Sequence, residues 1–167
     1  GTTRILDHIH WDRFQKNPKW LIGFSDITAL HLQIQQLGYQ SLHAPTLNNW
    51  GDSDAVQHIY QALFHTPKVL NAPAEKGNRL GEVRGQVVGG NLCMLNHLIG
   101  TANDIDTRGK ILFIEEVGEA AYAIDRLLLQ CQRAGKFANI AGLLVGNMDI
   151  DSAKQNEMRV VKNEIAK

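Results

Sequence analysis

The chain has 167 residues, of which 44% are hydrophobic and 20% are charged, a composition typical of a globular protein and not of a disordered one. Lysine and arginine together number 17, as do aspartate and glutamate, so the formal net charge is zero. Because no basic cluster is present either, we expect neither nucleic acid nor an acidic membrane surface as a partner. No run approaches the ~20 apolar residues that a membrane-spanning helix needs, so we expect a soluble chain.

The N-terminal part of the sequence alternates between helical and strand patterns. Apolar residues at helical spacing predict a helix over residues 3–9, followed by a polar turn over residues 12–17. The apolar run at residues 20–24 predicts a strand, which passes through a tight turn into a helix over residues 27–37 that Gly38 closes. Because the chain starts without Met and lacks the opening strand of a complete α/β domain, we expect sequence to be missing at both ends.

The periodic spacing of apolar residues ends after two further elements. Residues 40–43 predict a short strand, and residues 56–64 keep the i, i+3, i+4 rhythm of a helix. From residue 66 onward, prolines and a glycine interrupt any periodic pattern, which is typical of a linker. We therefore place a domain boundary near residue 75.

Beyond this boundary, strands and helices alternate again. The patterns predict strands over residues 82–88, 110–114 and 140–145, and helices over residues 91–99, 120–131 and 153–165. The predicted fold class is therefore α/β. The two cysteines, Cys93 and Cys131, lie in helical patterns, which favours reduced, buried thiols in a reducing compartment over a disulfide framework.

Ser25 lies at the tight turn within Gly23-Phe24-Ser25-Asp26. A serine between a buried strand and a helix has its hydroxyl lifted out of the backbone, and the N-terminus of the helix directs N–H groups at neighbouring atoms. The N–H of Asp26 is then placed to donate to the oxyanion of a tetrahedral intermediate, a contact worth ~3 kcal/mol in the transition state. The alternative is that Ser25 or Asp26 only caps the helix.

Glu115 is the second candidate for a role in chemistry. It ends the apolar run 111–114 and is expected at the carboxyl edge of a sheet, where ligand sites of α/β proteins gather. A carboxylate there can orient the imidazole that activates a serine hydroxyl, although a solvated strand end or a helix cap fits the same position. None of the seven histidines is convincing as that base, and His43, in a predicted turn, is the best placed.

Gly89-Gly90-Asn91 precedes a predicted helix. The two glycines let the backbone pass close to another surface, which is either a ligand or a packed helix. No phosphate-loop lysine and no GxGxxG accompany them, so we do not predict a nucleotide site. The histidines also lack metal-type spacing, since His8 and His10 do not share one helix face, and we expect no metal and no cofactor.

Several motifs occur in an order that resembles the LD-carboxypeptidase family of serine peptidases. These motifs are residues 17–19, 23–30, 89–92, 100–101, 111–116 and 124–130, and the resemblance covers residues 1 to about 146. It implies a flavodoxin-like N-terminal domain that supplies the nucleophile, with residues 1–75 as its C-terminal part. It also implies a smaller, swivelling β/β/α-type C-terminal domain, with residues 76–167 as its N-terminal part.

The resemblance also assigns roles to single residues. Ser25 matches the nucleophile and Glu115 the acid of a Ser-His-Glu triad. The oxyanion hole would take the N–H of Asp26 and one from a glycine-rich turn whose last glycine matches Gly1. We expect Gly90 and Asn91 close to the substrate. The catalytic histidine of the family follows a glycine downstream of the glutamate, and no such Gly-His segment occurs before Lys167, so residues 1–167 alone are expected to be inactive.

The implied activity is hydrolysis of the amide bond to the terminal D-alanine of murein tetrapeptides, a cytoplasmic step of cell-wall recycling, by a homodimer. Two alternatives stay open at this point. One is a peptidase of the related microcin-immunity branch, which cleaves a peptidyl-nucleotide antibiotic. The other is a binding module that has lost the histidine. A glutaminase-like amidotransferase would need a cysteine at position 25, which holds a serine.

Overall fold

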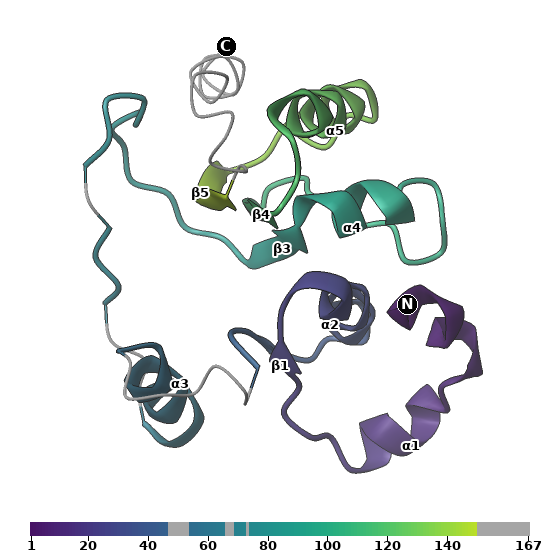
Figure 1. Cartoon of the computed structure of the whole chain (residues 1–167). Coiled ribbons are helices and arrows are strands. Elements are labelled where there is room, and N and C mark those ends of the chain that lie inside the picture. Colours follow the sequence, from purple (N-terminus) through teal and green to yellow (C-terminus); the bar gives the residue numbers. More distant parts are fainter. Residues whose placement is uncertain (47–53, 66–68, 73, 150–167) are drawn as a thin grey trace. The chain divides into compact units, whose positions relative to one another are not determined.

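The computed structural model describes residues 1–46, 54–65, 69–72 and 74–149. The chain divides into two compact units, Gly1–Glu75 and Lys76–Lys167 (Figure 1). The first unit has a two-stranded sheet and the second a three-stranded sheet, and the strands in both are parallel. The α/β class is therefore confirmed. The helix predicted over residues 153–165 lies outside the described residues.

The first unit is built around a short parallel strand pair. In chain order its elements are the 3₁₀ turns η1 (Thr2–Arg4) and η2 (Leu6–His8), α1 (Trp11–Lys16), β1 (Ile22–Gly23), the 3₁₀ turn η3 (Ser25–Ile27), α2 (Thr28–Gln36), β2 (Leu42–His43) and α3 (Asp54–Phe64). β1 and β2 pair in register, with Ile22 opposite Leu42 and Gly23 opposite His43. The strand, turn and helix around Ser25 are thus confirmed.

The helix α2 carries the largest group of buried residues in the described part of this unit. Its apolar side chains at Ala29, Leu32 and Ile34 are at most 3% exposed. Beyond its end, Gly38 has a φ of 85°, and the N–H of Tyr39 donates to the carbonyl of Ile34 at 3.1 Å. A glycine takes this left-handed conformation without a Cβ clash, so Gly38 closes the helix as predicted.

Two predictions for the start of the chain are wrong in detail. Residues 3–9 form the two short turns η1 and η2 in place of one helix, and the predicted polar turn over residues 12–17 is largely the helix α1. Trp11 and Phe14 lie one helical turn apart, with ring centroids at 6.0 Å, and Phe14 also packs edge-on against Tyr39 at 5.4 Å. This aromatic packing stabilises a helix whose other residues are polar.

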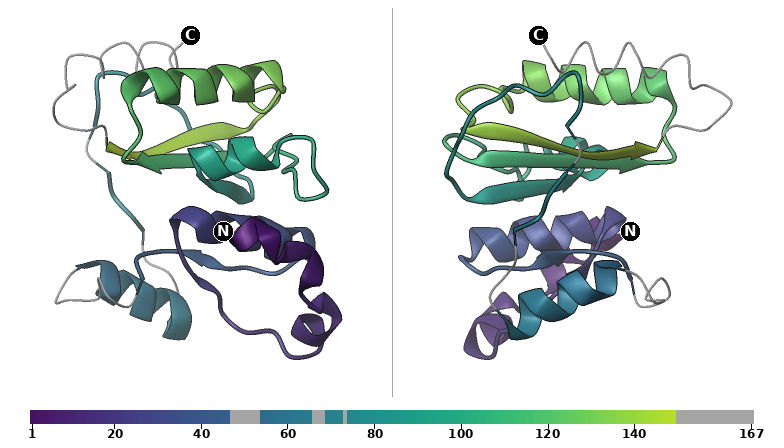
Figure 2. Two further views of the ribbon diagram at one scale, coloured as in Figure 1. Left: turned by 45° about the vertical axis from the view of Figure 1, so that its right-hand side comes forward. Right: turned by 90° about the vertical axis from the view of Figure 1, so that its left-hand side faces the viewer.

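The second unit is a βαβαβ arrangement with strand order β3-β4-β5. Its elements are β3 (Val87–Asn91), α4 (Leu92–Leu98), β4 (Ile111–Val117), α5 (Ala121–Arg133) and β5 (Gly142–Asp149). Figure 2 shows α5 lying along one face of this sheet, and α4 touches α5 where the Asn96 amide donates to Cys131 Sγ at 3.3 Å. The strand predicted over residues 82–88 is displaced: β3 begins only at Val87.

Buried apolar residues of β4 and of the two helices form the core of this unit. Leu92, Leu112, Ile114 and Ile124 are at most 1% exposed. Cys131 joins this core, and burial raises the pKa of its thiol to about 11. Cys93 is exposed, contrary to the prediction, because it follows Leu92 by one position and so lies off the apolar stripe of α4.

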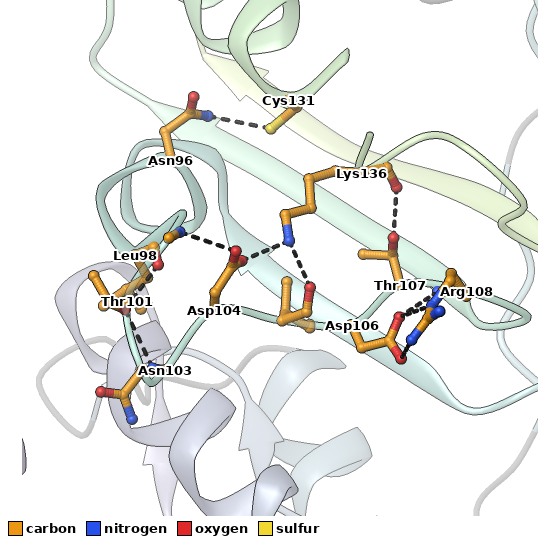
Figure 3. Close-up of polar contacts among 12 residues, drawn as sticks. Asn96, Leu98, Thr101, Asn103, Asp104, Asp106, Thr107, Arg108, Cys131 and Lys136 are labelled. Atoms are coloured by element: carbon orange, nitrogen blue, oxygen red, sulfur yellow. Dashed lines mark hydrogen bonds and ion pairs between the residues drawn. The ribbon is translucent and has the colours of Figure 1, made fainter. Parts of the chain in front are cut away.

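A polar cluster secures the loop between α4 and β4 (Figure 3). Lys136, which follows α5, forms an ion pair with Asp104 at 2.6 Å and donates to the carbonyl of Ile105 at 2.8 Å. In return, the hydroxyl of Thr107 donates to the carbonyl of Lys136 at 2.7 Å. The lysine side chain is 14% exposed, so these contacts are shielded from water and fix the loop that leads into β4.

Candidate active site

Ser25 occupies a strained turn between β1 and the helical segment η3–α2. Phe24 before it is fully extended, with φ −146° and ψ −174°, whereas Ser25 has a φ of 58°. Apart from glycines, only Asn139 also has a positive φ among the described residues. A residue with a Cβ pays roughly 1–2 kcal/mol in this region, so the turn is held by its surroundings. The Ser25 side chain is exposed at this strand-to-helix elbow.

The backbone before Ser25 is held by a buried histidine. His31 Nε2 lies 2.9 Å from the carbonyl oxygen of Gly23, and His31 Nδ1 lies 2.8 Å from Ser41 Oγ. The ring is 6% exposed, and burial lowers its pKa, opposed by the hydrogen bond to Gly23 and assisted by nearby His43. In the sequence, His31 is one of seven histidines and no motif singles it out. The feature that could have revealed its role is that a polar residue occurs within the apolar stripe of α2.

Asp26 ties the start of the chain to this elbow. Its carboxylate accepts hydrogen bonds from the backbone N–H of Thr2, at 2.6 Å, and from the hydroxyl of Thr2. Gly1 lies against the same carboxylate, since a Cβ on Gly1 would be 3.1 Å from Asp26 Oδ1. The two residues predicted to supply oxyanion-hole N–H groups are therefore neighbours, and the side chain of Asp26 has a positioning function that the sequence did not reveal.

Glu115 lies inside β4, whose last residues are Glu116 and Val117. The strand therefore runs beyond the apolar run on which it was predicted, and Glu115 is 7% exposed. On β3 its register partner is Asn91. On the β5 side the register shifts between Ile114 and Glu116, and a Cβ on Gly146 would be 3.1 Å from the Cβ of Glu115. Bulges of this kind re-aim side chains next to functional sites.

Gly89 and Asn91 have structural roles in the second unit. With a φ of 126°, a Cβ on Gly89 would lie 1.9 Å from the carbonyl oxygen of Phe113, so only glycine fits against β4. The surface next to Gly89 is thus a neighbouring strand, and not the ligand or the packed helix that the sequence suggested. Asn91 caps α4, because its Oδ1 accepts from the N–H of Met94 at 3.1 Å.

Glu116 is a buried carboxylate that the sequence did not single out. It is 3% exposed and accepts hydrogen bonds from the Asn91 amide at 2.9 Å, the N–H of Cys93 at 2.8 Å and the N–H of Val117 at 3.0 Å. These donors join the start of α4 to the end of β4. Glu116 therefore stabilises the end of β4 next to Glu115. The feature that could have revealed it in the sequence is the acidic pair after the apolar run.

The predicted site residues fall into two groups. Those in the first unit are Ser25, Asp26 and Gly1, and those in the second are Gly90, Asn91 and Glu115. His43 lies within β2 and not in the turn that follows, with its ring centroid 5.8 Å from that of His31. In the described part of the chain, no group of three or more His, Cys, Asp or Glu side chains is arranged to hold a metal. Nor is any helix there long and apolar enough to cross a membrane.

Two domain families match the chain. Residues 1–44 match the LD-carboxypeptidase N-terminal domain, and residues 84–167 match the LD-carboxypeptidase C-terminal domain. A protein of Bacillus subtilis named probable murein peptide carboxypeptidase is 40% identical over 153 residues, covering 87% of this chain and 48% of that protein. The murein tetrapeptide carboxypeptidase of Pseudomonas aeruginosa is 27% identical, covering 88% of this chain and 52% of that protein. The chain spans about half the length of these relatives.

Solved structures of related proteins share the fold of this chain. Muramoyltetrapeptide carboxypeptidase from Oxalobacter formigenes has a TM-score of 0.86 and 25% identity, covering 98% of this chain and 59% of its own. An MccF-like protein from Bacillus anthracis has a TM-score of 0.81 at 24% identity, covering 99% of this chain and 59% of its own. With both domain matches in chain order, one of them over half of the chain, the chain belongs to the LD-carboxypeptidase family.

Proposed function

We propose that this protein is a serine-type carboxypeptidase that hydrolyses the amide bond to the terminal D-alanine of murein tetrapeptides. The observation that carries the proposal is the exposed Ser25 at a φ of 58° on a strand-to-helix turn. A strained turn of this kind is how hydrolases present a nucleophilic serine. The substrate class is supported by the names of relatives that act on murein peptides.

In the proposed reaction, Ser25 Oγ attacks the carbonyl carbon next to D-alanine, and its proton passes to a histidine that lies outside residues 1–167. The N–H groups of Asp26 and Gly1 stabilise the oxyanion. The C–N bond then breaks, and the histidine donates the proton to the leaving amine of D-alanine. Water hydrolyses the acyl ester and releases the shortened peptide. Glu115 orients the histidine throughout.

The proposal extends to the organisation of the whole protein. The first unit would be the C-terminal part of a flavodoxin-like domain that bears the nucleophile. The second would be the N-terminal part of a smaller, swivelling domain that bears Glu115. The separate domain matches at residues 1–44 and 84–167 support this division. Gly90 and Asn91 would lie near the substrate, and we propose a cytoplasmic homodimer that uses no metal or cofactor.

A second reading places the protein in the microcin-immunity branch. Structures of the self-immunity protein MccF share the fold, with a TM-score of 0.79 at 22% identity for one in complex with glutamyl sulfamoyl guanosine. That likeness concerns the fold alone. A third reading, a binding module without catalysis, follows from the absence of a Gly-His segment in residues 1–167. Turnover and binding of two substrates separate these three readings.

The test compares two substrates with the full-length protein. One is a murein tetrapeptide, with released D-alanine measured by a coupled D-amino acid oxidase assay. The other is a glutamyl sulfamoyl nucleoside, with cleavage followed by chromatography. We expect turnover of the tetrapeptide and little of the nucleoside. The reverse preference would assign the microcin-immunity branch, and binding of either compound without turnover would assign a binding module.

A further inference from the structure

His31 joins three elements of the first unit through its two ring nitrogens. The residue lies on the buried face of α2, where it is 6% exposed. Nε2 reaches the carbonyl of Gly23 at the end of β1, and Nδ1 reaches the hydroxyl of Ser41 just before β2, at 2.9 and 2.8 Å. A buried ring bonded at both nitrogens cannot act as a proton shuttle to Ser25, so its role has to be sought elsewhere.

The chemistry of the two partners fixes the position of the ring protons. A carbonyl oxygen only accepts hydrogen bonds, so Nε2 must carry a proton and donate it to Gly23. Burial disfavours the charged ring, which leaves Nδ1 with a lone pair that accepts the hydroxyl proton of Ser41. The Ser41 hydroxyl can donate or accept, so the Gly23 carbonyl sets this tautomer and Ser41 satisfies Nδ1. The alternative tautomer would direct the Nε2 lone pair at the carbonyl oxygen.

The carbonyl held in this way lies directly before the elbow. Gly23 O also accepts the N–H of Ala44 at 3.0 Å, so both of its lone pairs are used. Only Phe24 separates Gly23 from Ser25, and the positive φ of Ser25 persists only if the flanking backbone is fixed. The hydrogen bond from His31 is the side-chain contact that fixes this carbonyl from the helix side.

We propose that His31 is a positioning residue for the nucleophile: protonated at Nε2, with Nδ1 accepting from Ser41, it holds the Gly23 carbonyl and thereby the turn that presents Ser25. This inference rests on the proposed function. It predicts that His31 affects the rate of acyl transfer more than the affinity for substrate, because no substrate contact is involved.

The experiment measures D-alanine release by the full-length protein carrying His31→Leu, His31→Gln or Ser41→Ala. We expect His31→Leu to lower kcat at least 10-fold with KM within about twofold of the wild type. His31→Gln should recover part of this loss, because its amide can donate to the Gly23 carbonyl. Adding Ser41→Ala to His31→Gln should lower kcat no further, since Ser41 acts through the imidazole.

A spectroscopic readout accompanies the kinetics and does not depend on turnover. In ¹⁵N-histidine NMR spectra of the wild type at pH 7.5, the inference predicts a protonated Nε2 and an unprotonated Nδ1 for His31. A protonated Nδ1 with a bare Nε2, or an unchanged kcat in folded His31→Leu protein, would overturn the inference while leaving the proposed function intact. Absence of D-alanine release by the wild type would instead overturn the proposed function.

Discussion

Replacing Ser25 with glycine should stabilise the protein while removing its proposed nucleophile. The φ of 58° costs a residue with a Cβ roughly 1–2 kcal/mol, which glycine avoids. The larger entropy of the unfolded glycine backbone offsets about 0.5–1 kcal/mol of this stabilisation. The net gain is therefore about 0.5–1 kcal/mol in the free energy of unfolding. Ser25→Ala keeps the Cβ and should show no such gain.

Urea unfolding followed by intrinsic fluorescence measures this difference. For a slope of about 2 kcal/mol per molar urea, the midpoint of Ser25→Gly should lie roughly 0.3–0.5 M above that of Ser25→Ala. Asn139→Gly is the matched control, because Asn139 is exposed and has a φ of 59°. It should gain stability and keep full activity. A Ser25→Gly protein no more stable than Ser25→Ala would refute the strained elbow.

Three further outcomes follow from the second unit. Glu116→Gln should lower the free energy of unfolding, measured in urea, by about 1–3 kcal/mol, because an amide nitrogen cannot accept the N–H of Cys93. The control is Glu82→Gln, whose side chain is 86% exposed and which should change the free energy of unfolding by less than about 0.5 kcal/mol. Gly89→Ala, whose Cβ would lie 1.9 Å from a carbonyl oxygen, should give mostly insoluble protein on expression. Of Cys93 and Cys131, only Cys93 should react with Ellman's reagent in the native protein, which comparison with Cys93→Ser and Cys131→Ser variants would show; fast reaction of native Cys131 would contradict its buried position.

Much of the fold was predictable because its strongest local signals agree with its tertiary contacts. The helices predicted over residues 27–37 and 120–131 are present as α2 and α5, with Ile34 and Ile124 buried as their periodicity indicates, and Gly38 ends α2 where its sequence position predicts. Trp11 to Lys16 was mistaken for a turn because its helix is stabilised by aromatic packing against Tyr39, 25 residues after Phe14. Contacts at that separation leave no local pattern in the sequence.

The candidate site was only partly predictable for a related reason. Ser25 was visible as a serine between a strand and a helix, but its positive φ and its support by His31 depend on tertiary contacts. Glu116 was passed over because adjacent carboxylates look alike in sequence. Its structural role rests on hydrogen bonds from Asn91 and Cys93, 25 and 23 residues away, which leave no local pattern in the sequence.

The proposed role of Ser25 is tested directly by the initial rate of D-alanine release from murein tetrapeptide, measured for the full-length protein and its Ser25→Ala variant. Catalytic groups that act as a unit lose nearly all of their effect when the nucleophile is removed, so the variant should be slower by at least about three orders of magnitude. Asn139→Gly protein, prepared in parallel, should retain the wild-type rate. A Ser25→Ala variant that releases D-alanine at the wild-type rate would contradict a nucleophilic role for Ser25.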